Sequence, residues 1–262
     1  MKLPTNDSIR KYWDSKAENL KTDPSATMKD VILRSMEIQA INARLNPYDT
    51  LLDIGCGNAF GSIEFAQHCG SVLAVDYSDK MIAMAQEAIR DCNLDNIHAE
   101  VGDVLAIGSL YPNAFNSVSS IRCLINLPDE KSQYQAIEQL SRVLVDGGRL
   151  FLLEGVAEHF NAMNFARQQM GLSSIDLDWH NHLFAKDDLE KALKKHFVIE
   201  EIVDFGEYYF LSRIIHPLVT KPEDPSFNGL MNHIAREVWL KQISVGAFAG
   251  MSTLVLYICR KL

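Results

Sequence analysis

The segment LLDIGCGNAFGS, residues 51–62, decides the fold. It begins with a short apolar run, as a buried strand does, and places Gly55 and Gly57 one residue apart directly after that run. Glycine has no Cβ, so this loop can turn tightly and bring its backbone close to a ligand. Asp53 lies inside the apolar run, two residues before the first glycine. The segment therefore predicts a strand that ends at a ligand-binding loop.

Apolar strands and amphipathic helices alternate along the chain. Strands are predicted over residues 50–55, 71–76, 97–103, 115–121, 149–155, 196–205 and 253–261. Ser78 is predicted to cap the second helix, another helix is expected over 129–144, and Gly147 and Gly148 are expected to form a turn. This alternation favours a doubly wound, mostly parallel α/β sheet of seven strands, with ligands bound beyond the carboxyl ends of the strands.

Two carboxylates indicate the ligand of the first loop. Asp76 ends the second predicted strand, where it can accept both hydroxyls of a ribose. Asp53 stands where the nicotinamide-binding pattern has glycine or an apolar residue, and a carboxylate there suits an ammonium group better than a pyrophosphate. A cationic ligand with a ribose points to S-adenosylmethionine. A nicotinamide-dependent oxidoreductase or a catalytically silent binding module stays open as an alternative.

Several motifs, spread over residues 10–155, together resemble the class I S-adenosylmethionine-dependent methyltransferases, with their Rossmann-like fold. The stretches that carry the resemblance are LLDIGCGNA (51–59), AVDYSDKMIAMA (74–85), VGDV (101–104) and LVDGGRLFLLEG (144–155). One position departs from the pattern, because Ala59 stands where many members have a third glycine. The resemblance implies S-adenosyl-L-methionine as the cofactor and methyl transfer as the reaction.

The resemblance also implies which residues hold the cofactor. Residues that match Asp53, Gly55 and Gly57 hold its amino-acid end, those that match Asp76 and Tyr77 hold the ribose and adenine, and those that match Asp103 and Val104 meet the adenine edge. The full set of cofactor-binding candidates is Trp13, Asp53, Gly55, Gly57, Asn58, Asp76, Tyr77, Met81, Asp103, Val104 and Arg122.

The N-terminal residues 1–45 are expected to form a helical lid over the cofactor-binding core of residues 46–155. In related enzymes an N-terminal helix folds over the cofactor, where Tyr12 and Trp13 would exclude water from the sulfonium or hydrogen-bond the methionine carboxylate. The alternative is that Trp13 packs against the edge of the sheet.

Two extra segments are expected to form a cap that binds the methyl acceptor within the same single domain, 1–262. They cover residues 156–195, after the fifth strand, and residues 206–252, after the sixth, where a short hairpin would suffice. Aromatic, arginine and histidine side chains suit a pocket for a polar ring or phosphate. The substrate-binding candidates are Asn126, Asn181, Tyr208, Arg213 and His216.

Two residues are candidates for the catalytic chemistry. His180, in the stretch WHNH (179–182), can act as a general base because the pKa of histidine lies near working pH. Glu154 ends the fifth predicted strand and is placed by topology beside the methyl group. His180 and His182 point to opposite sides of an extended chain, so no metal site is expected.

Composition limits the choice of acceptor. The formal net charge of −9, without a run of basic residues, repels nucleic acid. No apolar stretch suggests a membrane span or signal peptide, and five scattered cysteines suggest reduced thiols, so a cytoplasmic protein is expected. A small polar metabolite, with a sugar or nucleotide-sugar among the candidates, is the expected acceptor, methylated on oxygen or nitrogen. Methylation of RNA or protein stays open as an alternative function. The oligomeric state also stays open, with a homodimer as one possibility.

Overall fold

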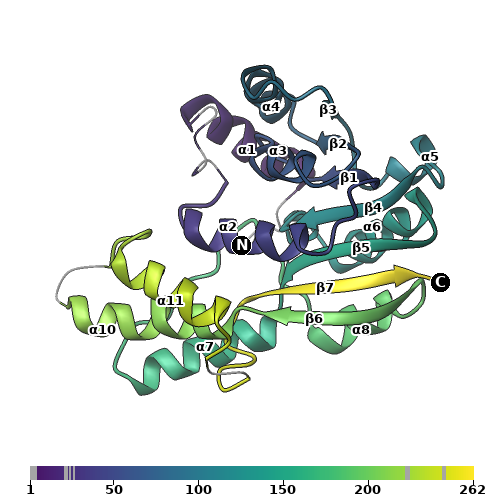
Figure 1. Ribbon diagram of the computed structural model, residues 1–262. Helices are drawn as coiled ribbons and strands as arrows, with labels where there is room; N and C mark the ends of the chain where they lie inside the picture. The colour runs from purple at the N-terminus through teal and green to yellow at the C-terminus, as the bar shows by residue number, and fades with distance from the viewer. Residues whose placement is uncertain (1–4, 21–22, 24, 26, 222–224, 244–245) are drawn as a thin grey trace.

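The computed structural model describes residues 5–20, 23, 25, 27–221, 225–243 and 246–262, and these build one seven-stranded sheet in the order β3-β2-β1-β4-β5-β7-β6 (Figure 1). The strands are β1 (Thr50–Ile54), β2 (Ser71–Asp76), β3 (Ile97–Val101), β4 (Phe115–Ile121), β5 (Leu144–Gly155), β6 (Phe197–Asp204) and β7 (Leu254–Lys261). The first five strands pair in parallel, and β7 runs antiparallel to β5 and β6. The expected doubly wound, mostly parallel sheet is confirmed.

Helices cover both faces of the sheet because successive strand residues point to opposite sides. In β5, Leu150 and Leu152 are buried in a core with residues of α6 (Glu130–Val143) and α8 (Lys186–Leu193), near the short α5 (Ile107–Leu110). Phe151 and Leu153 are buried on the other side with residues of α2 (Val31–Asn42) and α3 (Phe60–Ala66). The strands are therefore apolar on both faces, which is why the sequence shows continuous apolar runs.

Local signals set the start of α4 (Asp79–Asp91). The Ser78 side chain accepts a hydrogen bond of 3.0 Å from the backbone N–H of Met81, so the predicted helix cap is confirmed. Asp79 lies in the first turn of the helix and Arg90 in the last, and this charge order suits the helix dipole.

The expected turn at Gly147 and Gly148 is wrong, because β5 is continuous from Leu144 to Gly155. The pairing of β4 with β5 shifts register between Phe115 and Ser117, and Gly147 has a φ of 73°. The two glycines therefore lie at an irregularity inside β5, where Gly147 adopts a left-handed backbone conformation.

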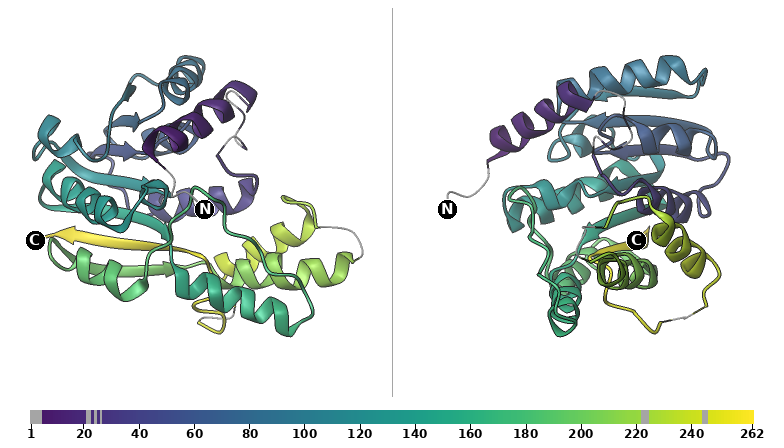
Figure 2. Two further views of the ribbon diagram at one scale, coloured as in Figure 1. Left: turned by 180° about the vertical axis from the view of Figure 1, so that it is seen from behind. Right: turned by 90° about the vertical axis from the view of Figure 1, so that its left-hand side faces the viewer.

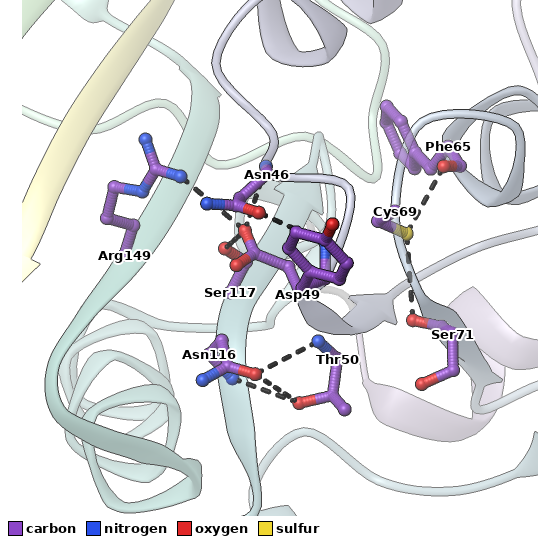
Figure 3. Close-up of polar contacts among 10 residues, drawn as sticks. Asn46, Asp49, Thr50, Phe65, Cys69, Ser71, Asn116, Ser117 and Arg149 are labelled. Carbon is purple, nitrogen blue, oxygen red and sulfur yellow. Dashed lines mark hydrogen bonds and ion pairs between the residues drawn. The ribbon is translucent and has the colours of Figure 1, made fainter.

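Polar contacts join the strands at the end of the sheet where β1 begins (Figure 3). The amide oxygen of Asn116 accepts hydrogen bonds from the backbone N–H and the hydroxyl of Thr50, at 3.1 and 2.9 Å. Beside them, Ser117 donates to the Asp49 carboxylate over 2.7 Å, and Arg149 pairs with the same carboxylate at 3.5 Å. This end of the sheet is held by side chains that bond to one another, and the ligand-binding loops lie at the other end.

Extra helices gather beyond the carboxyl ends of the parallel strands (Figures 1 and 2). They are α7 (Ala157–Gln169), α9 (Gly206–Tyr209), η3 (Phe210–Ile215), α10 (His216–Thr220) and α11 (Leu230–Leu240). The expected cap segment 156–195 is too long, because α8 buries Leu189 and Leu193 in the core that covers the sheet. Its amphipathic sequence KDDLEKAL makes it an ordinary covering helix.

The first helix, α1 (Asn6–Leu20), lies beside α4 in both figures. Three polar contacts join the two helices: Ser78 donates to Asp14 over 2.5 Å, Arg10 pairs with Asp79 at 2.5 Å, and Lys80 pairs with Glu18 at 3.1 Å. The helix α2, by contrast, is packed on the sheet. Of the two helices described in the expected lid of residues 1–45, α1 is the one that stands apart from the sheet-covering layers.

Among the described residues, no helix combines the length and apolar character that crossing a bilayer requires.

Candidate functional site

A cavity of about 710 Å³ opens at the carboxyl ends of β1 to β4. Its wall comes from the loops after these strands, from α1, from α2 and from the segment around residue 180. A volume of this size is typical of a site for small molecules. The sequence-predicted residues in its wall are Trp13, Asp53, Gly55, Gly57, Asp76, Tyr77, Met81, Asp103, Val104, Arg122, Asn126, His180 and Asn181.

The two glycines of the first loop have no room for a side chain. Gly55 has a φ of 75°, and a Cβ built on it would lie 2.6 Å from the Cβ of Cys123. Gly57 has a φ of 56°, and its Cβ would lie 2.9 Å from a methyl group of Thr27. Both positions therefore need glycine for conformation and for space. The backbone of this loop forms part of the cavity wall.

Two buried carboxylates lie at the ends of β1 and β2. Asp53 accepts a hydrogen bond of 2.5 Å from Ser62, and burial raises the pKa of its carboxyl to about 6. Asp76 accepts from the backbone N–H groups of Gly57 and Ser78, each over 2.9 Å, and burial likewise raises the pKa of Asp76. Both carboxylates face a cavity from which a cation or a hydroxyl could complete their bonding.

Residues after β2 and β3 shape the far side of this wall. Met81 is buried on α4, and Tyr77 is 41% exposed with the Arg10 guanidinium 5.1 Å from its ring centroid. Asp103 accepts a hydrogen bond of 2.8 Å from the backbone N–H of Leu105, beside the buried Val104. This part of the cavity wall therefore combines apolar and aromatic side chains with a carboxylate, a composition that suits a planar heterocycle.

Asn58, expected to bind the cofactor, does not belong to the cavity wall. Its side chain is buried and donates a hydrogen bond of 3.0 Å to the backbone oxygen of Asp23. The side chain at this position therefore points from the loop toward the preceding chain and holds residue 23 in place.

The helix α1 covers the cavity with aromatic side chains. The indole N–H of Trp13 donates a hydrogen bond of 3.3 Å to the amide oxygen of Asn126, which belongs to η2 (Leu124–Asn126). The Tyr12 ring lies 4.4 Å from the His180 ring between centroids, and Trp13 lies 5.5 Å from it. The aromatic rings thus lie over the cavity, where a lid is expected, and Trp13 does not pack at the sheet edge.

Three charged side chains lie together where α2 meets the end of β4. Arg122 has a φ of 53° and donates a hydrogen bond to the fully buried carboxylate of Glu37. Arg34, one turn earlier on α2, is only 6% exposed, and burial lowers the pKa of its guanidinium to about 10. Both arginines belong to the cavity wall. Arg34 and Glu37 were missed by the sequence analysis, although two charges three residues apart on an apolar helix face were a visible signal.

Glu154, expected to be catalytic, does not reach the cavity. Its fully buried carboxylate accepts hydrogen bonds from the backbone N–H groups of Leu124 and Ile125, at 2.8 and 3.1 Å. Burial raises the pKa of Glu154 to about 8. Glu154 therefore supports η2 from behind, because its carboxyl group accepts hydrogen bonds from the first backbone donors of this turn.

His180 lies in the cavity wall beside α1 and is only 4% exposed. Its segment is joined to η2, because the backbone N–H of His182 donates to the backbone oxygen of Ile125 over 2.7 Å. Burial lowers the pKa of His180, so its imidazole is neutral at neutral pH. Within the described ranges, its Nδ1 is enclosed and has no hydrogen-bond partner.

Comparison with known proteins agrees with this geometry. Residues 51–148 match a family model described as a methyltransferase domain. One relative, 27-O-demethylrifamycin SV methyltransferase of Amycolatopsis mediterranei (strain S699), is 32% identical over 144 residues, which cover 54% of this chain and 48% of that protein. Residues 51–148 belong to the class I S-adenosylmethionine-dependent methyltransferases. The chain spans about half the length of the curated relatives that it matches, such as this one.

Solved structures share the fold of this methyltransferase domain along nearly the whole chain. Geranyl diphosphate C-methyltransferase from Streptomyces coelicolor A3(2), in complex with Mg²⁺, geranyl diphosphate and S-adenosyl-L-homocysteine, has a TM-score of 0.62 at 16% identity, covering 98% of each chain. The [4+2]-cyclase SpnF has a TM-score of 0.66 at 16% identity, covering 99% of this chain and 97% of its own. These likenesses show the fold alone.

The residues of the methyltransferase domain fit S-adenosylmethionine, the cofactor of its class. Asp53 and Asp76 are carboxylates in the cavity wall, where Asp53 suits the ammonium group of the cofactor and Asp76 suits its ribose hydroxyls. The left-handed glycines leave the backbone bare beside them. Asp103 and Val104 belong to the same cavity wall, where a carboxylate beside an apolar side chain suits the adenine ring. In the part of the chain that the structure describes, no group of three or more His, Cys, Asp or Glu side chains is placed to hold a metal ion.

Three of the residues expected to bind the acceptor lie elsewhere than expected. Tyr208, Arg213 and His216 are not part of the cavity wall. Tyr208 and Arg213 bond to the carboxylate of Asp30, at 2.7 and 2.5 Å, and Asp30 also caps α2. Their polar groups are used to dock the inserted helices on α2, whereas Phe227 from the same insertion does line the cavity.

Proposed function

We propose that this protein transfers a methyl group from S-adenosylmethionine to an oxygen or nitrogen atom of a small polar metabolite. The observation that carries the proposal is the continuity of the cavity. A single space joins Asp53 and Asp76, at the cofactor motifs, to Asn126, His180 and Asn181, which belong to none of these motifs. A methyl donor and an acceptor bound in one continuous cavity can meet without water between them.

For methyl transfer, the protein mainly has to align the methyl donor with the acceptor, and little of the chemistry depends on its side chains. When bound, the cofactor supplies an electrophilic methyl group on a positively charged sulfur. Asp53 would hold its ammonium group and Asp76 its ribose, and Gly55 would let the backbone approach it. Tyr12 and Trp13 on α1 would keep water out of the space where the acceptor approaches.

His180 is the proposed proton acceptor for an acceptor group that must lose a proton. A neutral imidazole can take a proton, and burial keeps this one neutral. Because Nδ1 is enclosed, Nε2 is the nitrogen left for the acceptor. The charged groups that act on this ring are Asp178 in its own segment and Lys16 on α1, which also line the cavity.

The size and cover of the cavity favour a small acceptor over a macromolecule. An RNA would meet a chain of net charge −9. A protein side chain would have to enter past α1, whose Tyr12 and Trp13 side chains form part of the cavity wall. Sugars and nucleotide-sugars are among the acceptors to be tried first, since the cavity wall offers amide, imidazole and lysine groups beside aromatic rings.

The fold alone does not establish methyl transfer, since the [4+2]-cyclase SpnF has the same fold. The test is therefore an assay that follows radiolabelled methyl from S-adenosylmethionine into fractionated cell metabolites. Asp76→Ala is expected to weaken S-adenosylhomocysteine binding in calorimetry by about 1–3 kcal/mol, because it removes charge-assisted bonds. Asp95→Ala, at an exposed position, is the matched control. Unchanged affinity in Asp76→Ala, or no labelled product from any fraction, would contradict the proposal.

A further inference from the structure

The charged side chains of the cavity wall fall into two groups. Under the proposed function, on which this inference rests, the aspartates at the cofactor motifs are used by the cofactor. The arginines of the wall interact with carboxylates of the protein, namely those of Asp79, Glu37 and Asp53. The charged side chains that remain belong to Lys16, Lys29 and Asp178, and none of these three forms an ion pair with another described residue.

The charges that remain favour an anionic acceptor. Two lysines against one aspartate leave a positive excess in the wall, and the sulfur of a bound cofactor carries a further positive charge. Opposite charges attract more strongly where water is partly excluded, as in a cavity, and like charges repel. An anion is therefore favoured over a cation as the methyl acceptor.

Lys16 is better placed for such an anion than Lys29. It lies on the face of α1 that also carries Ile9, Tyr12 and Trp13, because residues three and four apart share one side of a helix, and all four line the cavity. Lys16 is partly buried, whereas Lys29 is exposed. A partly buried charge interacts more strongly with a ligand, because less water screens it.

Lys16 also lies near the proposed base. Its Nζ atom lies 5.4 Å from the centroid of the Tyr12 ring, and the same ring lies 4.4 Å from the His180 ring between centroids. Burial lowers the pKa of His180, Asp178 raises it and Lys16 lowers it, so the charge of Lys16 acts on the imidazole. An acceptor held by Lys16 would therefore lie close to His180.

We propose that Lys16 binds an anionic group of the methyl acceptor, a carboxylate or a phosphate, so that the acceptor is a small anionic metabolite. An ammonium group carries a full positive charge and three N–H donors on a flexible stem, so it can bind either anion. Lys16 thus selects the acceptor by its charge, and the place of Lys16 beside Tyr12 brings the reacting group of that acceptor toward His180.

The first test reads the charge of the product. The wild-type protein is given radiolabelled S-adenosylmethionine and fractionated cell metabolites, and the mixture is passed over an anion-exchange column at neutral pH. A reaction without the protein shows where the unreacted cofactor elutes. The labelled product is expected to be retained and to be released by salt. New label that appears only in the unretained fraction overturns the proposal, whereas no labelled product from any metabolite fraction overturns the proposed function and this inference with it.

Alkaline phosphatase distinguishes the two kinds of anion. Loss of acceptor activity after the active fraction is treated supports the proposal with a phosphate on the acceptor. Retained activity, with a labelled product that still binds to the column, supports it with a carboxylate or a phosphate diester.

The second test changes Lys16 itself. In Lys16→Met, the apparent KM for the active fraction is expected to rise on the order of tenfold or more, because hydrogen bonds to charged groups are strong. Lys16→Arg keeps the charge and is expected to recover most of this loss, and both variants should bind S-adenosylhomocysteine in calorimetry as the wild-type protein does. Lys11→Met is the matched control, since Lys11 lies on an exposed side of α1 and pairs with Asp7 at 2.8 Å. An unchanged KM in Lys16→Met, or a loss of S-adenosylhomocysteine affinity as large as the loss of acceptor use, overturns the role of Lys16.

Discussion

Glu154 on β5 accepts a hydrogen bond of 2.8 Å from the backbone N–H of Leu124, and so a buried carboxyl group holds the turn that forms the cavity floor. The same turn carries Asn126, whose amide oxygen accepts a hydrogen bond from the indole N–H of Trp13 on α1. Glu154 on β5 therefore helps to position η2, and η2 in turn holds Trp13 of α1 through Asn126. Glu154 was expected to be catalytic, but its carboxyl group binds backbone N–H groups instead.

This burial makes stability depend on pH. The pKa of Glu154 is raised from 4.5 to about 8 by burial, so the folded protein keeps a proton that the unfolded chain has lost. The stabilising contribution is thus full in acid and falls as pH rises from about 4.5 to about 8. Glu154→Gln cannot ionise, so urea unfolding at several pH values should show a flatter dependence in this variant. Glu87→Gln, at an exposed position, should keep the wild-type dependence, and an equal slope in both variants would contradict the prediction.

Two glycines with similar backbone angles separate conformation from space. Gly55 and Gly147 have φ values of 75° and 73°, so alanine at either position costs about 1–2 kcal/mol in strain. Only at Gly55 does a Cβ meet another side chain, that of Cys123, whereas none lies within 4 Å at Gly147. Gly55→Ala should therefore lose about 1–3 kcal/mol more in chemical unfolding than Gly147→Ala. It should also weaken S-adenosylhomocysteine binding, and equal losses in both variants would refute the steric argument.

The cofactor side of the site was predictable because its chemistry is local in the sequence. Asp53 and Gly55 lie two residues apart, and the strand that carries them fixes where they point. The predicted roles of Tyr208 and Arg213 depended on the path of a long insertion, and sequence position does not say which side of a helix faces a cavity. Arg34 was missed for a similar reason, because it lies in the cavity wall beside Arg122, and these two residues are far apart in the sequence.

The insertion should contribute stability rather than acceptor binding through Arg213. This side chain pairs with Asp30 at 2.5 Å, where Asp30 is 2% exposed and caps α2. Arg213→Ala leaves a buried carboxylate without its cation, so the free energy of unfolding should fall by about 3 kcal/mol. Arg260→Ala breaks an exposed pair with Glu200 and should cost less than about 1 kcal/mol. If Arg213→Ala is as stable as the wild-type protein but uses the acceptor poorly, the original assignment to the acceptor pocket returns.

The proposed role of His180 predicts how the rate of methyl transfer depends on pH. Burial lowers the pKa of His180 below its usual 6.5, so kcat/KM should fall only at pH values below 6.5, where the imidazole takes a proton from water and can no longer accept one. His180→Gln should lose on the order of a hundredfold in rate, as expected for a general base, and should lose this acidic limb of the pH profile. His98→Gln changes an exposed histidine on β3 and should leave both the rate and the profile intact. The same variants should bind S-adenosylhomocysteine equally well, because the role proposed for His180 concerns the acceptor and not the cofactor. If the His180→Gln protein keeps the acidic limb, another group titrates and the proposed role of His180 is wrong. The loss of rate would then reflect only the lost packing of the His180 ring against Tyr12.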